Sequence, residues 1–188
     1  MIYSLNDIPD EINTFIRREH FHIIIRGDIH TGKSTYLQKL LSEYPFLIPY
    51  GFYTKKSIGK CGIQDGLYIH SACIKENERF YSEHNRIAKI ANGSYVGTFN
   101  TNIFNSTGKQ LLTRTVKPNE VAIADEVGFL ERNAHDFLNA VSSCFNANRS
   151  IIAVFKNKSI SYLDEMLGIK DNLIINVLPD YKFSICFS

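Results

Sequence analysis

Short apolar runs alternate with amphipathic stretches along most of this chain. The runs at 21–26, 120–125 and 150–155 are rich in isoleucine, valine and alanine, which is typical of strands buried on both faces of a parallel sheet. Stretches with the apolar spacing of an amphipathic helix lie at 33–44 and 132–147. This alternation predicts an α/β fold, in which a mainly parallel sheet carries helices on both faces.

The rest of the chain supplies weaker signals. Pro45 ends the first helix, because its ring clashes with a continuing turn and it has no N–H to donate. Pro49 suggests that the next strand is irregular or at an edge in its early part. A helix that includes Gly108 is expected, although glycine costs about 1 kcal/mol there relative to alanine. The further expected elements are a strand at 46–53, helices at 102–115 and 160–168, and strands near 172–177 and 182–187.

Two segments add to this alternating frame. Within 55–100, Leu67–Ile69 and Ser71–Ile74 resemble the strands of an inserted β-hairpin, and Asn92-Gly93 is a strong turn signal. Residues 1–20 carry a partial helical stripe around Pro9 and are expected to pack on the domain edge, with docking of a partner as the alternative. We expect one domain over 1–188, because this length suffices for a substantial core.

A complete G-x-x-x-x-G-K-[ST] loop, the Walker A motif, follows the first strand and opens the first helix. Its glycines permit close approach of phosphate, its lysine delivers a cation to the β- and γ-phosphates, and its Ser34 hydroxyl is placed to ligate Mg²⁺. This arrangement predicts a nucleoside-triphosphate site at a helix N-terminus. The loop residues are Gly27, Asp28, Ile29, His30, Thr31, Gly32, Lys33, Ser34 and Thr35.

A second motif lies at the end of the apolar run 120–125, where Asp125 and Glu126 follow Val121–Ala124. Carboxylates at the carboxyl end of a strand face the crevice in which open α/β sheets bind ligands. In this Walker B position we expect Asp125 to hold Mg²⁺ and Glu126 to orient or deprotonate an attacking water. Lys33 and Glu126 are thus the predicted catalytic residues. An acidic pair that only caps a surface strand is the alternative.

These motifs, in this order, resemble the thermophilic or cancer-related nucleoside-triphosphatase family of small P-loop enzymes. The resemblance rests on the loop Gly27–Thr35, Gly51-Phe52-Tyr53-Thr54, the segment from Gly97 to Gly108, Asp125-Glu126-Val127-Gly128-Phe129-Leu130-Glu131, and the final strand Ile151–Phe155. It implies a three-layer P-loop fold, a hairpin that covers the nucleotide, and Mg²⁺-dependent hydrolysis of nucleoside triphosphates to diphosphates with loose base preference.

Three departures from the family pattern concern substrate range and rate more than fold. About twenty residues precede the first strand, where the family usually begins. The basic turn after the last quoted strand reads Lys156-Asn157-Lys158, whereas the family often has histidine and arginine there. The middle segment is also divergent.

Several single residues keep two interpretations. His30 is expected to be a loop filler, with a catalytic acid as the alternative. Glu131 either contacts water or substrate near the site or caps the following helix. Arg86 and Arg114 are candidates for an arginine finger in cis, although most arginines serve the surface. Tyr53 either contacts nucleotide or packs.

Other functions on the same scaffold are a nucleotide or small-molecule kinase, a GTP-driven switch and a motor. A kinase usually carries an arginine-rich lid, and the arginines here are scattered apart from Arg17-Arg18. A switch reads guanine with Asn-Lys-x-Asp, but Asn157-Lys158-Ser159-Ile160 ends in isoleucine. The chain length and the absence of a basic stripe count against a motor.

Composition limits the partners. A net charge of +2 gives no electrostatic footprint for nucleic acid. No apolar run approaches the ~20 residues that a membrane helix needs, and the N-terminus does not read as a signal peptide. The 4 cysteines are widely spaced without a zinc pattern, so we expect free thiols in a reducing, cytoplasmic compartment.

Overall fold

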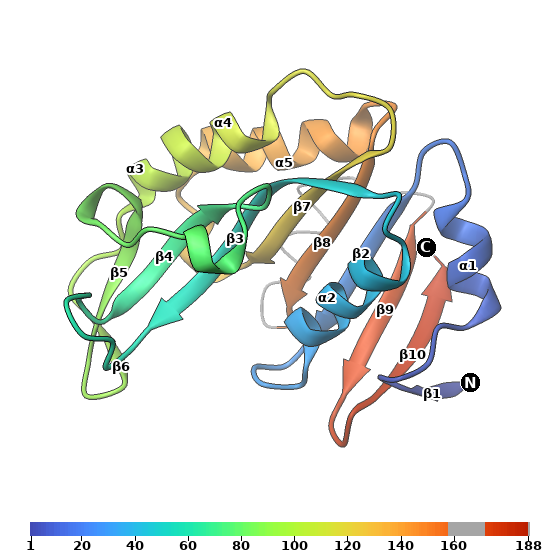
Figure 1. Ribbon diagram of the computed structural model, residues 1–188, viewed down its shortest axis with the longest axis horizontal. Coiled ribbons are helices and arrows are strands. Elements are labelled where there is room, and N and C mark those ends of the chain that lie inside the picture. The colour runs from blue at the N-terminus through green and yellow to red at the C-terminus, as the bar shows by residue number, and fades with distance from the viewer. Residues whose placement is uncertain (158–171, 188) are drawn as a thin grey trace.

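The computed structural model describes residues 1–157 and 172–187. Within these ranges the strands form a single sheet in the order β1-β10-β9-β2-β8-β7-β3-β4-β5-β6 (Figure 1). The predicted helix at 160–168 lies outside the described residues. In the described part, no helix is long and apolar enough to cross a membrane.

The centre of the sheet is parallel, as the apolar runs predicted. Ile24 on one strand is in register with Ala153 on the next, and Ile123 is in register with Ile152. Buried isoleucine and valine side chains occupy both faces of these strands, because helices cover each side. The parallel strands are β9 (Leu173–Leu178), β2 (His22–Gly27), β8 (Ser150–Lys156), β7 (Glu120–Val127) and β3 (Ile48–Ser57).

Antiparallel strands extend the sheet at both ends, so that it is mixed as a whole. β10 (Lys182–Phe187) and β1 (Ile2–Ser4) follow β9, whereas β4 (Gly66–Ser71), β5 (Arg86–Ala91) and β6 (Ser94–Val96) follow β3. The insertion is therefore larger than one hairpin. The Asn92-Gly93 turn is confirmed, since both residues have positive φ and join β5 to β6.

One part of the hairpin prediction is wrong. Ser71–Ile74 does not form a strand of its own, because β4 ends at Ser71 and the chain then turns. β4 instead pairs with β3 on one side and β5 on the other. The hairpin partner of β4 is therefore the preceding strand, β3, and not the apolar residues that follow it.

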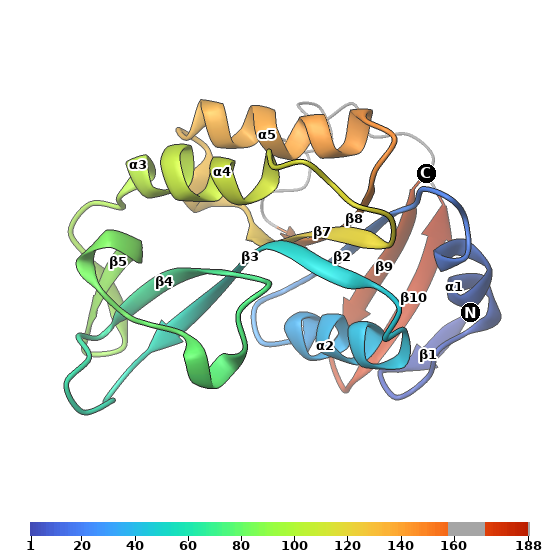
Figure 2. The same cartoon turned by 45° about the horizontal axis from the view of Figure 1, so that its top comes forward.

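Helices cover opposite faces of the sheet (Figure 2). On one face lie α1 (Asp10–Ile16) and α2 (Lys33–Glu43), and on the other lie α3 (Thr101–Ile103), α4 (Lys109–Leu112) and α5 (His135–Asn146). Two buried clusters, one on each side, form the core. Short 3₁₀ turns occur at Glu76–Glu78, Glu83–Asn85 and Phe129–Glu131.

The helix predicted over 102–115 is shorter and irregular. α3 and α4 are joined by a π-helical turn, Phe104–Gly108, and the helix ends at Leu112. At Gly108 an added Cβ would lie 2.9 Å from Phe137 Cδ2. The glycine therefore permits this helix to pack closely on α5, which offsets its poor helical propensity.

Boundaries elsewhere shift for local reasons. β3 begins at Ile48 and continues to Ser57, beyond the predicted end, because β4 pairs with its second half. Pro49 lies in the first half, which pairs with β7 and not with β4, so the early part of this strand is locally an edge, as expected. α5 begins at His135 instead of near 132.

The first twenty residues pack against the rest of the chain. Ile12, Phe15 and Ile16 of α1 are buried in the cluster that also holds Leu37 of α2. β1 pairs with β10 at the edge of the sheet. This segment is therefore part of the fold that the structure describes, as the helical stripe predicted.

Candidate nucleotide site

The phosphate loop joins β2 to α2 in the predicted strand–loop–helix order. β2 ends at Gly27 and α2 begins at Lys33. Gly32 has a φ of 99°, and a Cβ there would lie 2.8 Å from Leu5 Cδ1. At Gly27 a Cβ would lie 2.5 Å from the Val177 carbonyl oxygen. Both glycines are therefore needed for steric reasons before any phosphate is considered.

Lys33 is folded into its own loop. Its side chain is 5% exposed, and its Nζ donates to the Asp28 carbonyl oxygen at 2.5 Å. Burial lowers the pKa of Lys33, and the nearby Glu126 carboxylate opposes that effect. Asn157 Nδ2 donates to Asp28 Oδ1 at 3.2 Å, so the end of β8 also fixes the loop.

Asp125 meets Ser34 at the carboxyl end of β7. Asp125 Oδ1 accepts from Ser34 Oγ at 3.4 Å, and Oδ2 accepts from the Thr54 N–H at 3.3 Å. The carboxyl is fully buried, and this burial raises the pKa of Asp125 to about 6, with Lys55 opposing. A hydroxyl and a carboxylate this close provide the oxygen donors that Mg²⁺ prefers, with waters and phosphates completing its shell.

Glu126 adopts an unusual backbone conformation. Its φ is +62°, in the left-handed region, at a break in the register between β7 and β8. Such a bulge turns a side chain out of the regular alternation of a strand. Glu126 Oε2 accepts from Thr54 Oγ1 at 3.3 Å and lies 3.5 Å from Lys156 Nζ. The carboxylate is therefore held by β3 and β8 as well as by its own strand.

Glu131 caps the short turn after β7. Its Oε2 accepts from the Gly128 N–H at 2.7 Å, and its side chain is buried. Burial raises the pKa of Glu131 to about 7, against the backbone hydrogen bonds that lower it. This contact caps the turn that contains Glu131 and not the following helix, α5, which begins at His135, so the predicted cap of that helix is wrong.

The β5–β6 hairpin reaches this region through Tyr95. Burial, followed by the charges of Glu126 and Glu131, raises the pKa of Tyr95 to about 12. Lys56 Nζ lies 5.3 Å from the Tyr95 ring centroid. The charge of the predicted base therefore acts on a residue of the inserted strands.

The candidate arginine fingers are engaged elsewhere. Arg86 donates to Gln64 and Glu83 within the insertion. Arg114 pairs with Glu120 at 2.7 Å, at the amino end of β7 and so away from the phosphate loop. Tyr53 is buried beneath the Arg79 guanidinium, whose Cζ lies 5.5 Å from the ring centroid, so it packs.

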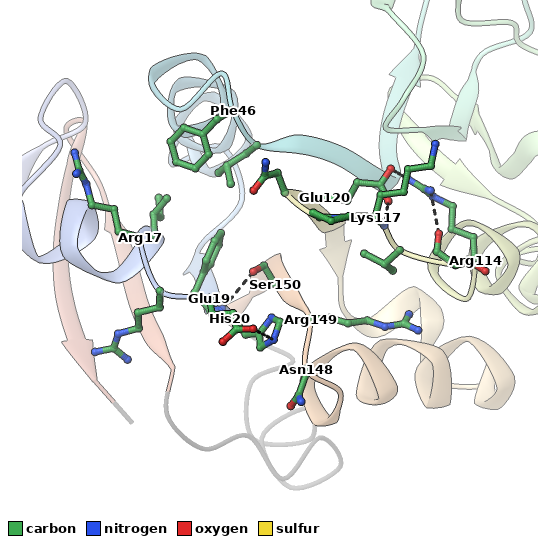
Figure 3. A pocket seen from close by; sticks show the side chains of 18 of the residues that line it. Arg17, Glu19, His20, Phe46, Arg114, Lys117, Glu120, Asn148, Arg149 and Ser150 are labelled. Carbon is green, nitrogen blue, oxygen red and sulfur yellow. Dashed lines mark hydrogen bonds and ion pairs between the residues drawn. The ribbon is translucent and has the colours of Figure 1, made fainter.

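A large cavity of about 1140 Å³ lies at the opposite end of the sheet (Figure 3). It is found where β3, β7 and β8 begin, whereas the phosphate loop lies where β2 ends. Cavity size therefore does not locate the predicted site. The cavity is lined in part by Arg17, Phe46, Arg114, Lys117, Glu120 and Arg149.

The structure brings together Lys33, Ser34, Asp125 and Glu126, which come from two separate parts of the sequence. It adds Thr54 and Lys156, to which sequence reasoning gave no role. Gly51, three residues before Thr54, is the sequence feature that could have indicated the contact between Thr54 and Asp125. Gly51 has a φ of 93°, and a Cβ there would collide with the Ile123 carbonyl oxygen. This glycine lets β3 approach β7, which places the Thr54 N–H on Asp125.

A family model described as NTPase matches residues 22–185. The structure is similar to THEP1 from the hyperthermophile Aquifex aeolicus, with a TM-score of 0.62 and 21% identity over 85% of this chain and 91% of that one. It is also similar to a human cancer-related nucleoside triphosphatase, with a TM-score of 0.57 and 16% identity over 85% and 90% of the two chains. Comparison with curated proteins gives no significant match.

Proposed function

The chain belongs to the NTPase family and is a nucleoside-triphosphatase, and on this premise we propose that it hydrolyses nucleoside triphosphates to diphosphate and phosphate with Mg²⁺ and loose base preference. The observation that carries the proposal is the placement of Glu126. A strained bulge directs this carboxylate out of β7 toward Lys156, where its charge also acts on Lys33 of the phosphate loop. The neighbouring Asp125 contacts the Ser34 hydroxyl of the same loop.

The loop residues bind the triphosphate. The N-terminus of α2 presents backbone N–H groups, and Lys33 exchanges its contact with the Asp28 carbonyl for the β- and γ-phosphates. Ser34 and Asp125 would hold Mg²⁺, because their oxygens already lie within hydrogen-bond distance. When bound there, the ion would neutralise charge on the phosphate oxygens.

Glu126 orients the attacking water and accepts its proton. Thr54 Oγ1 and Lys156 Nζ both contact its Oε2, so the other oxygen, Oε1, is the one available to the water. A side chain fixed from two strands loses little freedom in reaching the reactive geometry. Water activation by such a carboxylate favours a hydrolase over a kinase, which must exclude water.

Selection of guanine is not supported by the turn after β8. Asn157 contacts Asp28 of the phosphate loop instead of being directed to a base, and Ile160 stands where a guanine-reading motif has aspartate. We therefore propose that ATP, GTP and the pyrimidine triphosphates are all substrates. We also place the protein in the cytoplasm, since all four cysteines carry free thiols.

Phosphate release from ATP, GTP, CTP and UTP, with Mg²⁺ or with EDTA, tests the proposal. Lys33→Ala should abolish productive binding, because the phosphates lose their buried cation. Glu126→Gln should keep nucleotide binding and lower kcat by ~10²–10⁴-fold, the usual scale for a lost acid–base group.

Lys117→Ala and Glu43→Gln are matched controls, since both residues lie away from the loop, and both variants should retain full activity. Full turnover in Glu126→Gln would remove this residue from the mechanism. Tight binding of nucleotide by the native chain without phosphate release would overturn the proposed reaction.

A further inference from the structure

We propose that Tyr181, in the turn between β9 and β10, is the stacking platform for the nucleobase of the bound triphosphate. The inference rests on the proposed function and names a subsite for it.

The site sets the direction in which the nucleotide lies. Its γ-phosphate end is fixed on the side of β8 and β7, where Asp125, Glu126 and Lys156 converge. β2, which carries the phosphate loop, has β8 on one side and β9 on the other. The nucleoside therefore extends away from β7, toward the end of β9. Figure 1 shows the β9–β10 turn at the same end of the sheet as the phosphate loop.

Contacts connect this turn to the loop. Gly27 approaches the Val177 carbonyl, two residues before the turn begins at Pro179. Leu5 lies against Gly32, where a Cβ would be 2.8 Å from its Cδ1, and the Leu5 N–H donates to the Tyr181 carbonyl at 2.8 Å. The backbone of Tyr181 is thus connected to the phosphate loop through Leu5 of the N-terminal segment.

The Tyr181 side chain lies at the surface on a strained backbone. It is 76% exposed, and its φ of 56° follows another left-handed residue, Asp180, with a φ of 61°. The last position of a three-residue hairpin loop in this conformation favours glycine, and a bulky side chain there is strained. Strain of this kind is concentrated at functional sites. Here it presents an aromatic ring to solvent.

The exposed side chains of Tyr181 and Ile29 are suited to contact any of the nucleobases. Ile29 of the phosphate loop is also exposed, at 63%, and adds apolar area at the same edge of the sheet. Stacking on an aromatic ring tolerates every base, because each has a π-face, whereas hydrogen bonds to base edges would select among them. A platform of this type provides affinity together with loose base preference.

The experiment compares Tyr181→Gly and Tyr181→Phe with the native chain. KM and kcat are measured for ATP, GTP, CTP and UTP and for inorganic tripolyphosphate, dissociation constants for ADP are measured by calorimetry, and melting temperatures are recorded. Phe46→Ala is the matched control, because Phe46 is an exposed aromatic residue at the opposite end of the sheet.

We expect Tyr181→Gly to weaken binding of ADP and raise KM for all four nucleotides by about 10-fold, within the range measured for base stacking. KM for tripolyphosphate, which has no base, should stay within about twofold of the native value. The melting temperature should not fall, because glycine relieves the left-handed strain. Tyr181→Phe and Phe46→Ala should behave like the native chain.

Unchanged ADP affinity in Tyr181→Gly would overturn the platform and leave the hydrolase proposal standing. An equal rise in KM for tripolyphosphate would also overturn it, because the effect would then come from a disturbed phosphate loop. If the native chain hydrolyses neither nucleotides nor tripolyphosphate, the proposed function fails, and the ADP measurement still decides the role of Tyr181.

Discussion

Glu126 and Glu131 show how two carboxylates five residues apart come to differ. Glu126 is partly exposed and paired with Lys156 across the strand bulge. Glu131 is buried, and its contact is the Gly128 N–H. The two residues are of the same type, so it is their surroundings that make Glu126 suited to proton transfer and Glu131 suited to holding a turn.

The pH dependence of stability should report the burial of Glu131. Its folded-state pKa is raised from 4.5 to about 7, so the folded protein holds this proton more tightly than the unfolded chain does. The contribution of Glu131 to stability therefore falls as the pH rises between about 4.5 and 7. Glu131→Gln should melt near the native temperature at pH 5 and above it at pH 8, in thermal denaturation without nucleotide.

Glu43→Gln is the control for this comparison, because Glu43 lies on the surface of α2, and its pH dependence should match the native chain. A loss of stability in Glu131→Gln at pH 8 would contradict this prediction. The hydrogen bond from the Gly128 N–H to the carboxylate would then stabilise the fold by more than burial of the charge costs.

At the scale of elements, the close approach of β3 to β7 aligns the site. β3 pairs with β7 over Ile48–Phe52, and the residues just beyond this ladder, Tyr53 and Thr54, run past the end of β7. Thr54 then reaches both Asp125 and Glu126. A change that separates these two strands should disturb both carboxylates at once.

Gly51→Ala tests this alignment. A Cβ at position 51 would meet backbone atoms of Ile123, and the φ of 93° is itself unfavourable for alanine. We expect a loss of stability of about 2–4 kcal/mol in urea denaturation, from overpacking and strain together. The folded fraction should also show a reduced kcat, since Thr54 is displaced.

Gly59→Ala is a matched control, because Gly59 has a φ of 65° but no atom within 4 Å of an added Cβ. It should lose only about 1–2 kcal/mol, the cost of a left-handed alanine. Equal losses of stability in the two variants would show that the close contact between β3 and β7 at Gly51 adds no cost beyond that of a left-handed alanine.

At the scale of the whole molecule, the sheet separates two regions of different character. The residues proposed to bind phosphate lie at the carboxyl ends of the parallel strands, whereas the large cavity with Arg17, Lys117 and Arg149 lies at their amino ends. Ligands of parallel α/β sheets bind outside the carboxyl ends of the strands. The nucleotide is therefore expected to stabilise the fold from that end alone.

Thermal melts with ADP and Mg²⁺ test whether the nucleotide binds at the phosphate loop or in the cavity. Ligand at 100 times its Kd stabilises the folded state by about 2.7 kcal/mol, so a clear rise in melting temperature is expected for the native chain. Lys33→Ala should lose this rise, whereas Lys117→Ala, in the cavity, should keep it. The opposite pattern would place the nucleotide in the cavity.

The sequence alone determined the parallel centre of the sheet, the phosphate loop and the position of the Asp125-Glu126 pair. These features are local: apolar runs reflect burial on both faces, and the loop depends on glycines, a lysine and a hydroxyl at fixed spacing. The Asn92-Gly93 turn was likewise readable, because it requires two residues that tolerate positive φ.

Only the tertiary structure decided which distant residues meet. The contacts of Thr54 and Lys156 with Glu126 and the position of Leu5 between Gly32 and Tyr181 join segments far apart in sequence. The pairing of β4 with both β3 and β5 was likewise decided only there. Neither the bulge at Glu126 nor the strain at Tyr181 has a signal in residue type, since glutamate and tyrosine do not favour left-handed backbone. Pairing between strands imposes these conformations, so they arise only once the sheet has formed.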